Sequence, residues 1–529
     1  MTVRERLTEI FHAAAAYSDS LDGESIFGDG CVGRLGRPHA TLFLAAAIAA
    51  RDEKREESKV WFTNYALSLL AHLARIAEES NGLWDDESAF CLAYGVKALE
   101  EEIPAADVTE LSRYFGELTV EKPFRLSFAG DPGAALERTL YLAPKAMLYE
   151  LAGQARPSLA SVGKQLLDTM LPDGRSSLCP DASPLCWLAL MLLLSRESAP
   201  FKAYAAHFAA AIPLPDSTLP PSTYEYRLSM LALLLSLTPE AETNAPAPVL
   251  PVSEEYGEAE AAFVRGKQRV ATVCGLRHAT AVLPSDASDF ITAAALPALS
   301  VCGTTRYVNC GFSLTPYKGG FLTYTKETAD PFLDSHEPHA VTLYRATAVL
   351  PDDETVLYLS FGRCEASTRL SVLEDQLWQL SPDPSRIYYY ADAKRSLGVR
   401  ADPKTEVGCY FNVSDRIGVV SHTPMTAVSE KDGSRRLLLA RAEGPVRIGK
   451  GDTLFQSAAA IAVGGIRRTR ALADTFLTLD GLPRGILSVS AIAANRKRYT
   501  LLYNVTDAPF VWEDHTVAPE TAVLLAWDR

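Results

Sequence analysis

Side chains that transfer protons or hold anions gather in front of one strongly apolar stretch. Tyr224 and Tyr226 flank Glu225 and precede Arg227, directly before the apolar run 228–237. A guanidinium beside a phenol lowers the phenol pKa, and the first turn of a helix favours anions, so either tyrosine could act as a general base. The other interpretation is that this Tyr-x-Tyr-Arg segment only anchors the end of a helix.

His39, which follows Arg37-Pro38 at the start of another apolar stretch, is a second candidate for proton transfer. An imidazole beside an arginine could donate a proton or help to neutralise an anion. The competing interpretation is a solvent-exposed side chain in the cap region of a helix.

Aromatic and charged side chains suited to ligand binding begin two further stretches. Trp84 precedes Asp85 and Asp86, so an aromatic face for the apolar side of a sugar lies beside carboxylates for its hydroxyls. An ordinary acidic first turn explains the same residues equally well. Arg138 and Tyr141 start the other stretch, and Arg138 is a second candidate to hold a substrate carboxylate.

The second half of the chain contains one concentrated polar segment, Asp334-Ser335-His336-Glu337-Pro338-His339. Histidines three residues apart could bind a metal, although the spacing matches no specific site, and a polar turn before a strand is the alternative. No cofactor is expected from the sequence, and a structural divalent ion in the β half stays open.

The elements that must position the first-half residues are helices, because apolar residues recur there every three or four positions. Ten such stretches pair into five hairpins with a repeat of roughly 45 residues, a length typical of stacked helical arrays. They are Val3–Tyr17, Ala40–Ala50, Val60–Ile76, Ala89–Leu99, Val108–Phe115, Leu136–Leu151, Leu159–Met170, Leu185–Leu194, Phe201–Ala211 and Tyr226–Leu237. The second helix of each pair follows a Gly-, Pro- and Asp-rich loop and is the more apolar, so it should be buried.

This asymmetry predicts an incomplete (α/α)5 toroid over residues 1–245, with an inner ring of helices whose N-termini open on one mouth. The candidate residues named above lie at those N-termini, apart from His336 and His339, which are expected on a β-domain loop over the mouth.

After a Pro-, Ala- and Glu-rich linker at 246–258 the hydrophobic period changes to two, which is typical of strands. The expected strands are Gln268–Cys274, Arg306–Leu314, Gly320–Thr325, Ala340–Leu350, Thr355–Phe361, Arg386–Tyr390, Arg416–Ser421, Arg435–Ala440, Tyr499–Asn504 and Thr521–Ala526. Leu373–Leu380 cannot be assigned from its pattern. We therefore expect an α+β multidomain chain, in which a large antiparallel β-sandwich (259–473) and a small C-terminal β module (474–529) follow the toroid.

Charge and composition exclude several classes of partner. The 529 residues carry a formal net charge of −14 and no basic stripe, which disfavours nucleic acid. Residues 1–245 hold 21 basic and 33 acidic side chains, so most of the negative charge belongs to the predicted toroid. No apolar run is long enough to span a membrane, no secretory signal is visible, and nine scattered cysteines suggest a reducing compartment. A cytoplasmic location without membrane contact is expected.

No nucleotide-binding, zinc-protease or serine-hydrolase motif is present, so the architecture and its loops carry the functional hypothesis. The segment from Asp173-Gly174 through Ser183-Pro184 to Cys186-Trp187 resembles the loop of heparinase II/III lyases that leads through Ser-Pro and an aromatic residue into a helix. The order of toroid then β-domain is similar to that of these and of hyaluronate-lyase type polysaccharide lyases. Cys186-Trp187 replace the Tyr-His type pair of that family.

The resemblance implies β-elimination on a uronate-containing glycan, with Tyr224, Tyr226, Arg227, His39 and His339 as catalytic candidates. It implies sugar binding by the remaining mouth residues: Arg37, Trp84, Asp85, Asp86, Arg138, Tyr141, Trp187 and His336. Because the toroid half is acidic, a short oligosaccharide is expected rather than a long polyanion. Two alternatives remain: an inverting glycoside hydrolase that pairs Asp85 or Asp86 with Asp181 or Glu225, and a non-catalytic carbohydrate-binding protein.

Overall fold

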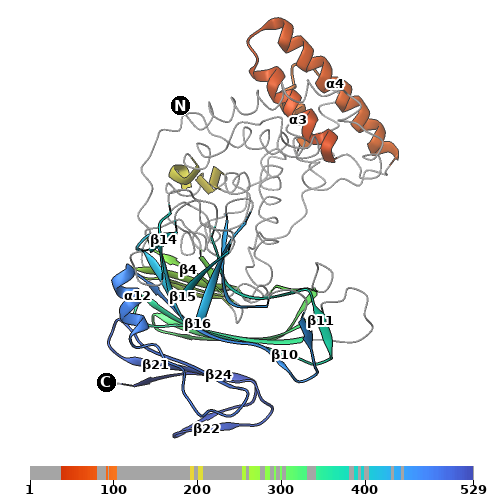
Figure 1. Ribbon diagram of the computed structural model, residues 1–529. Coiled ribbons are helices and arrows are strands. Elements are labelled where there is room, and N and C mark those ends of the chain that lie inside the picture. Colours follow the sequence, from red (N-terminus) through yellow and green to blue (C-terminus); the bar gives the residue numbers. More distant parts are fainter. Residues whose placement is uncertain are drawn as a thin grey trace.

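The computed structural model describes helical segments in the first half of the chain and a nearly continuous set of strands in the second (Figure 1). The described residues are 37–79, 91–92, 95–103, 191–192, 194–195, 201–205, 253–257, 261–274, 280–285, 291–293, 298–300, 306–330, 341–380, 386–390, 395–397, 404–430, 434–442 and 446–527.

Two antiparallel helices, α3 (Arg37–Asp52) and α4 (Glu56–Glu79), form the described helical hairpin. Ala40 and the run 43–50 are at most 5% exposed, as expected for an inner helix that is apolar on all sides. The chain turns between the helices at Glu53, whose carboxylate accepts hydrogen bonds from the backbone N–H groups of Lys54 and Arg55. These helices confirm the predictions for 40–50 and 60–76. The complete ring predicted for 1–245 lies largely outside the described residues.

A large antiparallel sheet forms the centre of the second half. Its strands, in spatial order, are β14 (Arg395–Leu397), β13 (Tyr388–Tyr390), β15 (Lys404–Val413), β16 (Ile417–Ser429), β19 (Thr453–Val463), β10 (Thr355–Cys364), β9 (Val341–Val349), β8 (Gly320–Asp330) and β7 (Arg306–Tyr317). A branch continues from β16 through β17 (Arg435–Ala442) and β12 (Val372–Leu380) to β6 (Ala298–Ser300).

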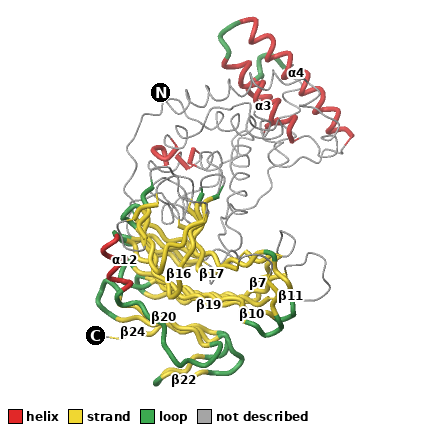
Figure 2. Tube along the Cα trace, viewed as in Figure 1, coloured by secondary structure: helices red, strands yellow, loops and turns green. Residues whose placement is uncertain are grey.

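Two further sheets lie against opposite faces of this central sheet (Figure 1). The first is a meander of β1 (Ser253–Gly257), β2 (Ala261–Arg265), β3 (Arg269–Cys274), β4 (Thr280–Pro284) and β5 (Ile291–Ala293). The second is C-terminal and contains β20 (Ile486–Ile492), β21 (Arg498–Asn504) and β24 (Thr521–Trp527). Smaller elements are the pair β11 (Thr368–Leu370) and β18 (Val446–Ile448), the hairpin β22 (Phe510–Trp512) and β23 (His515–Val517), and the helix α12 (Ile466–Ala473). Figure 2 shows the resulting stack of strand layers.

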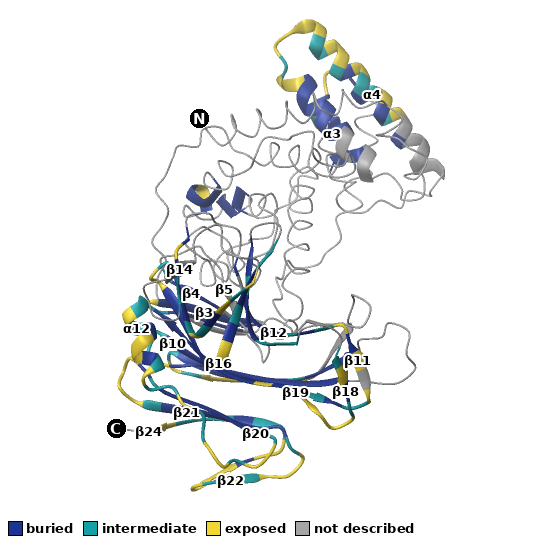
Figure 3. Ribbon diagram, viewed as in Figure 1, coloured by how far each residue is buried: buried dark blue, intermediate teal, exposed yellow. Residues whose placement is uncertain are grey.

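The layered arrangement explains why the central strands are apolar on both faces. Every residue of β9 is buried, and nine of the ten residues of β10 are buried (Figure 3). One face shares a core with the meander and β12, and the other shares a core with the C-terminal sheet. In β19 the small residues 458–460 permit close approach of layers on both sides.

The strand predictions agree with this structure at all ten positions, and the unassigned segment Leu373–Leu380 is a strand, β12. Several elements have no counterpart among the predicted ranges, among them β15, β19, β20 and α12. The basic run 467–470 is part of α12. Strand β1 falls within the residues assigned to the linker, and the proposed domain boundaries stay a prediction.

Among the described helices, none combines the length and the hydrophobicity that a membrane span requires.

Candidate functional site

Most of the side chains predicted to form the mouth of the toroid lie outside the described residues. These are Tyr224, Tyr226, Arg227, Trp84, Asp85, Asp86, Arg138, Tyr141, Trp187, His336 and His339. Arg37 and His39 belong to the first turn of α3, where only their backbone is described. The predicted catalytic set therefore stays a prediction. Within the described ranges, no group of three or more His, Cys, Asp or Glu side chains could hold a metal ion.

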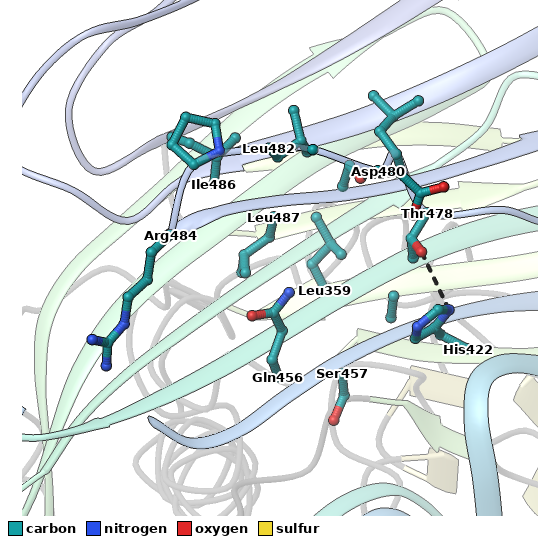
Figure 4. A pocket seen from close by; sticks show the side chains of 16 residues that line it. Leu359, His422, Gln456, Ser457, Thr478, Asp480, Leu482, Arg484, Ile486 and Leu487 are labelled. Carbon is teal, nitrogen blue, oxygen red and sulfur yellow. Dashed lines mark hydrogen bonds between the residues drawn. The ribbon is translucent and has the colours of Figure 1, made fainter. Parts of the chain in front are cut away.

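The described β layers contain a polar pocket at the seam between the central and C-terminal sheets (Figure 4). Its volume is about 240 Å³, and we call it the seam pocket. It is lined by Leu359 of β10, His422 of β16, residues 456–458 of β19, and the segment 478–488 that leads into β20.

The loop 478–485 takes its shape from glycines and a few local hydrogen bonds. Gly481 and Gly485 have φ angles of 72° and 86°, a left-handed conformation that side chains with a Cβ rarely adopt. The backbone N–H of Leu479 donates to Ser488 Oγ at 2.8 Å, and that of Ile486 donates to the Pro483 carbonyl at 3.0 Å. The Asp-Gly and Pro-Arg-Gly sequence of this segment therefore produces a compact loop directly before β20.

His422 faces this loop because β16 changes partners at that point. The strand pairs with β19 up to Ser421 and with β17 from Thr426 onward, so the residues between belong to neither ladder. The His422 side chain is exposed, and its Nδ1 lies 3.2 Å from Thr478 Oγ1 in a hydrogen bond (Figure 4). This bond occupies one ring nitrogen and fixes the ring, which leaves Nε2 for another partner.

Three other polar side chains surround the opening: Gln456, Asp480 and Arg484, all exposed. A hydrogen bond fixes the Arg484 side chain, because its Nη2 donates to the Gly451 carbonyl oxygen at 2.7 Å. Figure 4 shows Gln456 directed toward the pocket and Ser457 directed away from it, as alternation along β19 requires.

A second polar group is fully enclosed on the opposite face of the central sheet. Thr325, Arg345, Ser360 and Ser457 stand directly opposite one another across β8, β9, β10 and β19, and none is more than 4% exposed. We call these four residues the polar row. Arg345 Nη2 donates to Glu327 Oε1 at 2.7 Å, so this buried guanidinium has a carboxylate partner.

Asp375 of β12 approaches the polar row from the facing strand and accepts a hydrogen bond from Ser360 Oγ at 3.2 Å. Burial raises the pKa of Asp375 to about 6, although Ser457, Ser360 and Arg345 favour its charged form. Burial, with the nearby Asp375 charge, also raises the pKa of Tyr358. Tyr358 is 0% exposed. Because the polar row and its neighbours are enclosed in this way, they cannot contact a substrate, and they contribute to the packing between the layers.

The sequence analysis missed the seam pocket because no motif or cluster of polar residues singles out His422. The available signal was the turn-rich segment 478–485, whose two glycines indicate a sharply folded loop. Nothing in the sequence shows that this loop lies over β16, since 56 residues separate His422 from Thr478.

Comparisons with known proteins give little independent guidance. No protein-family model matches the chain, and no curated protein matches it. Among solved structures, a heparinase III with methylated lysines aligns with 92% of this chain and 75% of its own, at 10% identity and a TM-score of 0.42.

Two alpha-galactosidases align over shorter stretches. The galactosidase domain of the alpha-galactosidase-sucrose kinase AgaSK aligns with 40% of this chain and 41% of its own, at 9% identity and a TM-score of 0.25. The GH36 alpha-galactosidase AgaA from Geobacillus stearothermophilus aligns with 33% and 31%, at 8% identity and a TM-score of 0.24. This chain thus matches less than half of either galactosidase, and TM-scores below 0.5 assign it neither a fold family nor an activity.

Proposed function

We propose that this protein is a carbohydrate-active enzyme that cleaves uronate-containing oligosaccharides by β-elimination at the mouth of a helical toroid. The observation that carries the proposal is the order of its parts. A helix buried on all sides, α3, begins with Arg37 and His39, and antiparallel layers occupy the chain from β1 onward. The loop 173–187 and the segment 224–227 add polar residues at the starts of later predicted inner helices.

The reaction removes the C5 proton of a uronate and breaks the C4–O glycosidic bond, and the released electron pair forms a C4=C5 double bond. The C5 proton is weakly acidic until the neighbouring carboxylate is neutralised, a role we give to Arg227 or Arg138. Tyr224 or Tyr226 takes the proton, and His39 or His339 donates one to the leaving oxygen. No metal or cofactor takes part in this scheme.

The experiment is incubation of the full chain with uronate oligosaccharides while absorbance near ~230 nm, where the conjugated product absorbs, and reducing ends are followed together. The proposal expects both signals to rise in step. Reducing ends without the absorbance would show hydrolysis instead, and binding without either signal would show a non-catalytic protein.

The first prediction concerns the base. Tyr224→Phe and Tyr226→Phe each remove one phenol with little change in volume, and we expect the one that removes the base to lower the elimination rate by about 10²–10⁴-fold. Tyr389→Phe, in the described strand β13, is the matched control and should leave the rate unchanged. If both mouth variants and His339→Ala retained the full rate, the proposed site would be wrong.

A further inference from the structure

The seam pocket combines an apolar floor with a polar rim. Leu359 and Leu487 are each 1% exposed and Ala458 is 8% exposed, so buried aliphatic side chains close the floor, and the partly exposed Leu482 adds apolar surface to the lining. The side chains of Gln456 and Asp480 and the paired His422 and Thr478 stand around it. A ligand that fits this arrangement has one C–H-rich face and several hydrogen-bonding groups at its edge.

The charges at the rim argue against a strongly ionic ligand. Asp480 supplies one carboxylate and Arg484 one guanidinium to the lining of the same pocket. Arg484 attracts an anion that Asp480 repels, and Asp480 attracts a cation that Arg484 repels. A neutral ligand therefore meets the smallest electrostatic repulsion on binding. The carboxylate, carboxamide and imidazole together offer both donors and acceptors, as vicinal hydroxyls require.

The pocket is small and partly preorganised. Its volume of about 240 Å³ is below the ~300–1,000 Å³ typical of drug-sized ligands, which limits it to about one ring. Arg484 is held by the Gly451 carbonyl, and His422 is held by Thr478, so two of the rim side chains are positioned before a ligand arrives.

We propose that the seam pocket binds a single neutral, polyhydroxylated ring, that is, one uncharged monosaccharide unit. The ring packs its C–H face against Leu482 and Ala458, and its hydroxyls bond to Asp480, Gln456 and the Nε2 of His422. None of these residues belongs to the predicted catalytic set, so the pocket adds a binding function beyond the proposed elimination reaction.

Saturation-transfer NMR on the full-length protein tests this directly, with methyl α-glucoside and methyl α-galactoside as neutral probes and sodium galacturonate as the anionic comparison. A single ring with few contacts should bind with a Kd on the order of 1 mM. We expect saturation transfer to at least one neutral glycoside, and we expect a larger pocket-dependent part in its signal than in the galacturonate signal.

Two exposed substitutions locate the binding. Asp480→Ala and His422→Ala should each weaken the neutral glycoside about tenfold, since each removes a polar partner of the ring. Asp507→Ala, an exposed aspartate elsewhere in the C-terminal part, is the matched control and should change nothing. Galacturonate bound at the predicted mouth keeps its signal in both variants, so only the part of each signal that these substitutions remove reports on the seam pocket.

Three results would overturn the proposal. They are the absence of saturation transfer from both neutral glycosides, binding that survives both pocket substitutions unchanged, and pocket substitutions that reduce the galacturonate signal more than the neutral glycoside signal. Circular dichroism of the two variants confirms that their folds are intact before binding is compared.

Discussion

Asp375 is the carboxyl group whose protonation the β layers influence most directly. It is 0% exposed and accepts a hydrogen bond from Ser360, and burial raises its pKa to about 6. Arg345 lies in the polar row that Asp375 faces, but this arginine is already bonded to Glu327, so it compensates only part of the cost of a charge at Asp375. The folded protein therefore binds a proton at Asp375 more tightly than the unfolded chain does.

The second prediction is a pH dependence of stability specific to Asp375. The folded pKa of about 6 lies above the ordinary value of 3.8, so the stabilising effect of protonation is complete below about pH 4 and lost as the pH rises through 6. The loss amounts to about 3 kcal/mol. Relative to the native protein, Asp375→Asn should gain that amount in free energy of unfolding between pH 4 and 7.

Urea unfolding at a series of pH values measures this difference. The exposed Asp507→Asn provides the control, whose difference from the native protein should stay constant with pH. A constant difference for Asp375→Asn as well would mean that the pKa of Asp375 is the same in the folded protein as in the unfolded chain.

At the scale of elements, the packing of helix α12 against strand β16 depends on a glycine, Gly418. Thr469 of α12 is 0% exposed, and its Oγ1 accepts a hydrogen bond from Asn412 Nδ2 at 2.9 Å. A Cβ placed on Gly418 of β16 would lie 2.0 Å from that same Oγ1. Strand and helix can therefore approach this closely only because residue 418 has no side chain.

The third prediction follows from this contact. Gly418→Ala should force α12 away from β16, break the Asn412–Thr469 hydrogen bond and lower the free energy of unfolding by about 1–3 kcal/mol. Gly311→Ala is the matched control, because a Cβ there meets no atom within 4 Å. Equal urea midpoints for the two variants would show that α12 adjusts without cost.

Elements with a single exposed face or a strong apolar run have a clear hydrophobic pattern, and these elements were predicted from the sequence. Strands such as β16 and β21 and the helices α3 and α4 belong to this group. Strand β19 was missed because its centre is mostly alanine, which favours helices, and only tertiary burial on both faces makes it a strand. Likewise β12 carries Glu374 and Asp375 close to Trp378. Its sequence therefore shows neither the alternation of a strand nor the three- to four-residue spacing of a helix.

The seam pocket could not be predicted for a related reason. Its parts come from four strands and a loop, and the contact of His422 with Thr478 occurs where β16 changes from pairing with β19 to pairing with β17. A one-dimensional pattern carries propensity and period, but it does not specify which loop covers which strand edge.

At the scale of the whole molecule, one turn connects all three β layers. Asp352 lies in the turn between β9 and β10. Its Oδ1 is 3.8 Å from Nη1 of Arg269 in β3, and both side chains are fully buried. Its Oδ2 also accepts a hydrogen bond at 2.8 Å from the backbone N–H of Ala494, in the turn between β20 and β21. The meander, the central sheet and the C-terminal sheet thus meet at a single carboxylate.

Arg269 closes this junction by bonding backbone as well as Asp352. Its guanidinium donates to the carbonyl oxygens of Thr355 at 2.7 Å and Leu350 at 2.8 Å, which flank the same turn. Beside it, Asp353 accepts hydrogen bonds from the backbone N–H groups of Lys267 and Gln268, the turn between β2 and β3. The two turns are therefore bonded to each other. Removal of the Arg269 guanidinium leaves buried carbonyl acceptors unpaired and leaves Arg468, whose Nη2 lies 3.7 Å from Oδ2, as the remaining cation at Asp352.

The fourth prediction is that Arg269→Met destabilises the layers together rather than one at a time. Loss of one partner of a buried ion pair costs about 3–5 kcal/mol, and methionine fills only part of the space. Because Asp352 also holds the turn at Ala494, amide hydrogen exchange should become faster in β20 and β21 as well as in β3. Arg447→Met, at an exposed arginine, should change neither the urea midpoint nor the exchange. Faster exchange confined to β3 would mean that the meander is held to the central sheet independently of the C-terminal sheet.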